Sequence, residues 1–173
     1  MMKRIFAALC ALMVLTTACG GGNGGSSAPA APTLKEGVTL SSLMEELGTE
    51  YEISMPAAVD EQILKDMLSI SAEDVEEYAG SISMVMISAD NLIGVKAKEG
   101  KLEAVQKGLE DRLEFVRQSF EQYLPDQKEK AAAGKVVTVG DYAFLIIAGR
   151  MDKDPAAEVA EIEQKINDSF VTK

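Results

Sequence analysis

Apolar positions after residue 34 recur every three or four residues, a spacing that predicts short amphipathic helices. Two stretches show it, and their apolar positions are Leu40, Leu43, Met44 and Leu47, then Val59, Ile63, Met67 and Leu68. Pro56 separates the two stretches because proline is not tolerated inside a helix. Ser71, with Asp74 three residues later, resembles a capping box. The sequence therefore predicts a third short helix from Ser71 to Tyr78, stopped by Gly80.

Beyond Gly80 the pattern changes to β-type runs separated by turn compositions, which predicts strands. The predicted strands are Ile82–Ile87, Leu92–Lys98, Lys135–Val139 and Tyr142–Ala148. Gly140 and Asp141 between the last two fit the loop of a type II′ hairpin. The runs Met84–Ile87 and Phe144–Ile147 are apolar throughout, whereas a half-solvated strand alternates. We expect the N-terminal helices to cover the second face of these strands; a partner is the alternative.

Two longer amphipathic helices complete the pattern. An apolar stripe predicts a helix over residues 101–124 that Pro125 ends, with a further helical turn from Asp126 to Ala133. Asp154 followed by Pro155 is a typical helix start, and a last helix is expected over residues 155–170. The predicted fold is α+β: an antiparallel four-stranded sheet in β-β-α-β-β-α order, with two helices packed on one face and short helices preceding it.

The first 33 residues have a different composition. Lys3 and Arg4 precede an apolar run too short to span a bilayer, which is typical of an export signal. Small residues lead to Cys19, and a Gly/Ser-rich stretch follows it. We predict a lipoprotein signal peptide over residues 1–18, a lipidated Cys19 with a flexible linker over residues 19–33, and one domain over residues 34–173. An ordinary secretory signal with an incidental cysteine is the alternative.

The charge of the chain limits its partners. Its 28 acidic residues outnumber 17 basic ones, giving a net charge of −11. Such a chain is repelled by nucleic acid and by anionic lipid, so we expect no nucleic-acid partner and contact with the membrane only through the lipid on Cys19. The predicted location is the extracytoplasmic face of the cell membrane. The mature part keeps a single cysteine, so no disulfide is expected, and we predict a monomer.

Four segments together resemble a known family. They are Val75–Gly80, Ser88–Lys98, Phe120–Gln127 and Gly140–Tyr142. In combination they are similar to small lipoproteins of clostridial-type Gram-positive bacteria that share a domain of unknown function, number four-three-five-eight. The likeness covers about residues 70–150, and Gly94 stands where such proteins often have a larger residue. The resemblance implies a compact domain on a lipoprotein and supplies no activity, ligand or catalytic residue.

The residue inventory restricts catalysis. The chain has no histidine, which excludes Ser-His-Asp and Cys-His centres and most zinc sites. No nucleotide-binding or serine-nucleophile motif occurs, and Asp152 with Asp154 lacks the glycine of a calcium loop. Carboxylate pairs are too numerous to indicate a site. We therefore expect no cofactor, no metal and no catalytic residue.

Three functional hypotheses remain open. The first is a lipid-anchored binding or scaffolding module that contacts a protein or envelope partner. The others are a carboxylate-dependent hydrolase of cell-envelope material and an accessory solute-capture lipoprotein. For the first, the candidate contact residues are Met84, Met86, Phe144 and Ile146 on the predicted sheet face, with Tyr123 at the end of the long helix. Each of these residues has an apolar or aromatic side chain whose packing partner the sequence does not identify.

Overall fold

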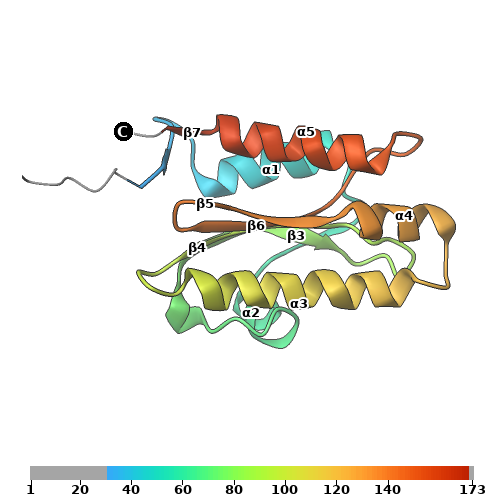
Figure 1. Ribbon diagram of the computed structural model, residues 1–173, viewed down its shortest axis with the longest axis horizontal. Helices are drawn as coiled ribbons and strands as arrows, with labels where there is room; N and C mark the ends of the chain where they lie inside the picture. The colour runs from blue at the N-terminus through green and yellow to red at the C-terminus, as the bar shows by residue number, and fades with distance from the viewer. Residues whose placement is uncertain (1–30, 172–173) are drawn as a thin grey trace, which may run out of the picture.

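A five-stranded antiparallel sheet runs through the middle of the protein, seen in a computed structural model that describes residues 31–171 (Figure 1). The strand order is β2-β3-β4-β6-β5. The strands are β2 (Pro56–Ala58), β3 (Val75–Ser83), β4 (Asn91–Ala97), β5 (Lys135–Val139) and β6 (Tyr142–Ile147). The α+β class is confirmed, but the predicted four-stranded sheet lacks β2. This strand has only three residues, too few to show alternation, and its Pro56 is tolerated because β2 lies at the sheet edge.

Helices cover both faces of the sheet (Figure 1). On one face lie α2 (Glu61–Asp66) and α3 (Leu102–Phe120), and on the other lie α1 (Leu40–Glu50) and α5 (Pro155–Asp168). The expectation that the two long helices share one face is therefore wrong. Every residue of β6 is buried, and every residue of β4 except Lys96 is buried as well. Because side chains of a strand point alternately to the two faces of the sheet, each face is covered by a helical layer of its own. The N-terminal helices are divided between the layers.

Several local signals decide where elements begin and turn. Asp154 caps α5 by accepting from the Ala157 amide at 3.0 Å, and Pro155 occupies the first turn, as the sequence predicts. Gly140 turns the predicted β5–β6 hairpin with φ of 57°. Thr39 and Ser42 form a reciprocal capping box at the start of α1, which the apolar spacing alone does not identify. All of these motifs depend on neighbours within a few residues, so tertiary packing does not override them.

The predicted helix from Ser71 to Tyr78 is wrong. The Ser71 side chain caps only one 3-10 turn, η1 (Ala72–Asp74), and the chain continues directly into β3. The reason is tertiary, because β3 pairs with β4 from Val75 to Ile82 and gains ladder hydrogen bonds there. Gly80, predicted as a helix stop, lies inside this strand.

The predicted strand from Ile82 to Ile87 is also wrong at its end. β3 stops at Ser83, and residues 84–90 form a loop that leads into β4. Its Met84, Met86 and Ile87 are exposed, so their continuous apolar pattern does not indicate a doubly covered strand. The strands covered on both faces are instead β4, which the sequence does not mark as apolar throughout, and β6, whose run Phe144–Ile147 is apolar throughout.

The helix predicted over residues 101–124 stops a few residues early, and the further helical turn predicted from Asp126 to Ala133 is a separate helix. α3 ends at Phe120, and α4 (Pro125–Ala133) begins at the proline that the sequence pattern assigns only to the end of the first helix. Leu124 between them has φ of 51°, which reverses the chain direction. Proline at the first position of a helix is favourable because its missing N–H has no partner there in any case.

Gly94 allows α1 to approach the sheet closely. A Cβ atom on Gly94 would lie 2.8 Å from Leu40 Cδ1 and 3.0 Å from Phe144 Cε1. A larger residue at this place, which the family resemblance associates with it, therefore requires α1 to sit further from β4. This chain uses the glycine to pack the helix directly on the strand.

The chain enters the domain at one end of the sheet. β1 (Thr33–Leu34) pairs with β7 (Phe170–Val171) as a separate two-stranded ladder, and Pro32 lies against the β5–β6 turn at Gly140. Thr33, which the sequence places at the end of the linker, is thus already part of a ladder. The β4–β6 register puts Gly140 and the loop of residues 84–90 at opposite ends of the sheet.

Candidate functional site: a braced methionine loop

Residues 84–90, which we call the methionine loop, present apolar side chains to solvent at one end of the sheet. Met84 is 63% exposed and Met86 is 93% exposed, and Ile87 beside them is exposed as well. A turn closed by the Ser88 amide, which donates to the Val85 carbonyl at 2.9 Å, places Met86 and Ile87 at its tip. Exposed apolar side chains gathered on one loop are a typical feature of contact surfaces.

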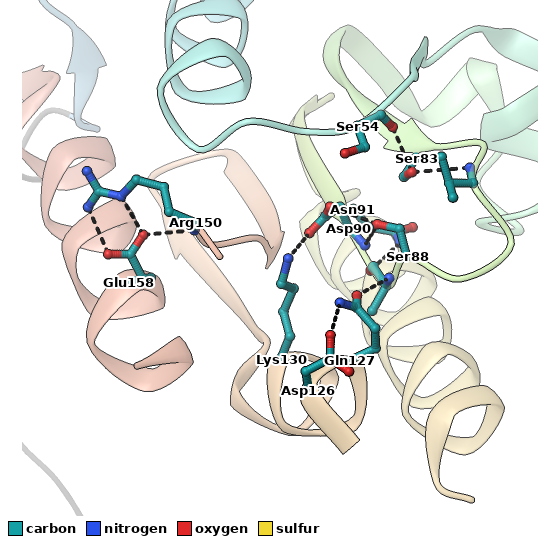
Figure 2. A network of polar contacts seen from close by, with 12 residues as sticks. Ser54, Ser83, Ser88, Asp90, Asn91, Asp126, Gln127, Lys130, Arg150 and Glu158 are labelled. Atoms are coloured by element: carbon teal, nitrogen blue, oxygen red, sulfur yellow. Dashed lines mark hydrogen bonds and ion pairs between the residues drawn. The ribbon is translucent and has the colours of Figure 1, made fainter. Parts of the chain in front are cut away.

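A buried polar network holds the far side of this loop (Figure 2). Lys130 on α4 donates to Asp90 Oδ1 at 2.7 Å, and Ser88 Oγ donates to Asp90 Oδ2 at 2.8 Å. Gln127, one turn earlier on α4, accepts the Ala89 amide proton at 2.9 Å. Both oxygens of the Asp90 carboxylate are therefore engaged, and the loop is attached to α4 at two points.

The Asp90–Lys130 pair is buried, with side-chain exposures of 6% and 11%. Moving two charges out of water costs several kcal/mol per ion, which good geometry and further hydrogen bonds must offset. A pair of apolar residues would hold the same volume without this cost. The pair contributes a defined attachment of the loop to α4 rather than a large net stabilisation.

Asn91 extends the network to α3. Its amide donates to the Ala89 carbonyl at 2.9 Å, and its oxygen accepts from Arg112 Nε at 2.9 Å. Burial lowers the pKa of Arg112 from its usual value, but a guanidinium stays charged well above neutral pH. Three elements, α3, α4 and the start of β4, thus converge on the base of the methionine loop.

The other side of the loop is joined to the chain segment before β2. Ser83 Oγ donates to the Ser54 carbonyl at 2.7 Å and accepts from the Val85 amide at 3.2 Å. The Met84 amide donates to the Met55 carbonyl at 3.2 Å, so Met55 lies opposite Met84. Met55 is 73% exposed and adopts φ of 43°, a left-handed conformation that is unfavourable for a residue with a side chain.

The structure separates the residues predicted as contact sites. Met84 and Met86 lie on the methionine loop, whereas Phe144 and Ile146 are fully buried under α1 and α5. The four do not form one surface, because β6 is covered on both faces. Tyr123 is exposed in the turn between α3 and α4. Cys19 lies outside the described residues.

The sequence alone does not identify the residues that hold the base of the methionine loop, which are Ser88, Asp90, Asn91, Arg112, Gln127 and Lys130. It assigns Ser88, Asp90 and Asn91 only to a turn, and it gives Lys130 no role beyond a short helix. One signal is present: Arg112 falls between Leu109 and Leu113 of the apolar stripe, a place where a charge needs a partner. The partner itself, Asn91, is distant in sequence and cannot be identified without the fold.

A second feature is a groove of about 620 Å³ between α1 and the β2–β3 edge of the sheet. Met44, Ile53 and Val59 provide apolar lining, and Glu45 and Glu52 lie on it as exposed carboxylates. The groove therefore offers volume, an apolar lining and negative charge.

A third cluster joins α1 to α5 around Tyr51. The ring is buried, with the Arg150 guanidinium 5.0 Å and the Lys165 ammonium 5.6 Å from its centroid. Burial raises the pKa of Tyr51, and the charge of Glu161 raises it further. Arg150 donates to both carboxylate oxygens of Glu158 at 2.8 Å and thereby lowers the pKa of that carboxyl. These contacts link the two helices and leave Tyr51 protonated at neutral pH.

A family model described as Domain of unknown function (DUF4358) matches residues 49–148. The match confirms the domain resemblance and begins at residue 49 rather than near residue 70, so it includes β2 and α2. It spans the whole methionine loop and all of its bracing residues. No curated protein and no solved structure matches the chain. Among residues 31–171, no helix is long and apolar enough to cross a membrane.

Proposed function

Since this chain belongs to the DUF4358 family, whose description states no activity, we propose from its geometry that it is a lipid-anchored, extracytoplasmic binding module. Its methionine loop makes the contact, and the occupant is a protein partner with an apolar surface. The observation that carries this proposal is the combination of exposed apolar side chains at the loop tip with a buried ionic brace at its base.

The bracing supports a binding role because a preformed loop loses less conformational entropy when a partner docks. Methionine side chains adapt to irregular surfaces and are frequent at such contacts. A loop without a function in contact would be expected to carry polar residues at its tip. Met86 stays in water although α3, α4 and β4 hold the base of the loop, so the loop is fixed with its tip exposed.

The position of the loop favours a protein over the membrane as the occupant. Pro32 lies at the β5–β6 turn, so a tether from Cys19 would enter the domain at the end of the sheet opposite the methionine loop. The anchored domain then presents the loop away from the lipid. The net charge of −11 also opposes insertion of the loop into an anionic leaflet.

The other two functions have weaker support. A carboxylate-dependent hydrolase needs one carboxyl in an environment that keeps it protonated, and the groove carboxylates of Glu45 and Glu52 are exposed. Solute capture in the same groove is supported by its volume alone. Neither proposal uses the methionine loop or the buried network at its base.

Site-specific photo-crosslinking in intact cells tests the proposal. A photoreactive side chain at position 86 of the full-length chain should give a discrete adduct with one partner protein, because Met86 is at the tip of the loop. The matched control places the same side chain at position 115, where Phe115 is exposed at the middle of α3, and should give no such adduct. Cys19→Ser should remove the protein from the membrane fraction and abolish the adduct.

Two outcomes would contradict the proposal. An absence of any adduct from position 86, with normal anchoring, would show that the loop has no partner. Equal adducts from positions 86 and 115 would show that crosslinking reflects crowding at the membrane rather than docking.

A further inference from the structure

We propose that Met55, Met84 and Met86 together bind one soft monovalent metal ion, Cu(I) or Ag(I), through their thioether sulfurs. The inference concerns the chemistry of the methionines and goes beyond the docking of a partner, which requires only their apolar surface. Nothing in the family description assigns a metal to this domain.

The end of the β2–β3 ladder brings the backbones of two of the methionines side by side. Pro56 pairs with Ser83 as the last step of the ladder, and just beyond it the Met84 amide donates to the Met55 carbonyl at 3.2 Å. Two unbranched side chains of three rotatable bonds can therefore direct their sulfurs to one point.

Met86 is in reach of the same point. It follows Met84 by two residues and occupies the turn that the Ser88 amide closes on the Val85 carbonyl. Because consecutive Cα atoms are about 3.8 Å apart, its backbone is at most about 7.6 Å from that of Met84. All three thioethers are exposed, and none is committed to the two hydrophobic cores.

The donor set selects a soft ion. Thioether sulfur prefers Cu(I) over hard cations such as Mg²⁺ and Ca²⁺, which take oxygen ligands. The chain has no histidine, and among residues 31–171 no group of three or more Cys, Asp or Glu side chains is placed to hold a metal. A thioether also carries no proton in its ligating form, so binding would not compete with protons as it does at imidazole or thiolate sites.

The backbone around the three residues is held in place before any ion binds. Ser83 Oγ joins the two strands by donating to the Ser54 carbonyl at 2.7 Å, and Asp90 fixes the return of the loop. Met55 keeps a left-handed conformation, with φ of 43°. Strain of this kind costs on the order of 1–3 kcal/mol and gathers at binding and catalytic sites.

Titration with Ag(I) tests the inference on the full-length chain with Cys10→Ser and Cys19→Ser, which removes both thiols. Labelling the methionine methyl groups with carbon-13 should show three resonances moving together and saturating at one equivalent. Met55→Leu, Met84→Leu and Met86→Leu should each weaken binding about tenfold or more, since leucine keeps the volume and lacks the sulfur. Met151→Leu, at another exposed methionine, should leave the affinity unchanged.

Lowering the pH from about 8 to 5 should change the Ag(I) affinity less than twofold, because no ligand is protonated in this range. The inference is overturned if Met151→Leu weakens binding as much as the loop variants, or if the triple leucine variant binds as tightly as the parent chain. A steep loss of affinity on acidification would identify other ligands.

The same variants separate this inference from the proposed docking function. Met55→Leu with Met84→Leu should abolish Ag(I) binding and leave crosslinking from position 86 intact, since the loop stays apolar. If the parent chain binds Ag(I) but position 86 gives no adduct in cells, the docking proposal alone is overturned.

Discussion

Gly80→Ala will lower the free energy of unfolding by about 4 kcal/mol or more, the range reserved for severe steric conflict. An added Cβ would lie 2.1 Å from the Leu92 carbonyl oxygen and 2.9 Å from Ile93 Cα. Both atoms belong to the backbone of β4 at the centre of the sheet, so they cannot move without breaking the ladder on either side. Gly80 also has φ of 118°, which side chains rarely adopt.

Urea denaturation of the parent chain and of Gly80→Ala measures this loss of stability. Gly100→Ala is the matched control. Gly100 also has a positive φ, of 74°, but no atom lies within 4 Å of the position that an added Cβ would take, so only the cost of the backbone conformation remains. That cost is about 1 kcal/mol. Equal stability of the two variants would show that β3 and β4 are not as close as described.

Lys130→Met will lower the free energy of unfolding by about 3–5 kcal/mol, because it leaves the Asp90 carboxylate buried without a counter-charge. Adding Asp90→Leu to the same protein should recover most of this loss, since the double variant buries no charge. The network therefore predicts a large coupling energy between the two positions. Urea denaturation of Lys130→Met, of Asp90→Leu and of the double variant, each compared with the parent chain, provides the double-mutant cycle that measures this coupling energy.

Lys107→Met is the control for this cycle. Lys107 forms an ion pair with Asp111 on the exposed side of α3, where both side chains are mostly in water. Such a pair contributes less than about 1 kcal/mol. If Lys130→Met is no more costly than Lys107→Met, or if the double variant is as unstable as the single one, the buried network is not formed as described.

Local chemistry in the sequence predicts much of this fold. The hairpin glycine at Gly140 and the Asp154–Pro155 helix start both use contacts within a few residues. The apolar stripe of α3 and the continuous run of β6 likewise identify the core-facing elements. Where a segment has two local options, as at Ser71, the outcome is decided by pairing with a distant strand.

The methionine loop shows why the sequence predicts only half of the site. The sequence predicts Met84 and Met86 as contact residues, but an apolar run of four residues is equally typical of a buried strand. Only the end of the β3–β4 ladder shows that the run lies in solvent. Asp90, Lys130 and Arg112 meet through three elements that the sequence alone cannot place relative to one another.

The buried network holds the methionine loop in one shape before anything binds to it, and backbone nitrogen-15 relaxation across residues 84–89 tests this directly. We expect order parameters of about 0.85, equal to those of β4, for the Val85, Ser88 and Ala89 amides that are hydrogen-bonded in the loop. Values below about 0.6 at these amides would show a flexible loop and contradict the preformed shape.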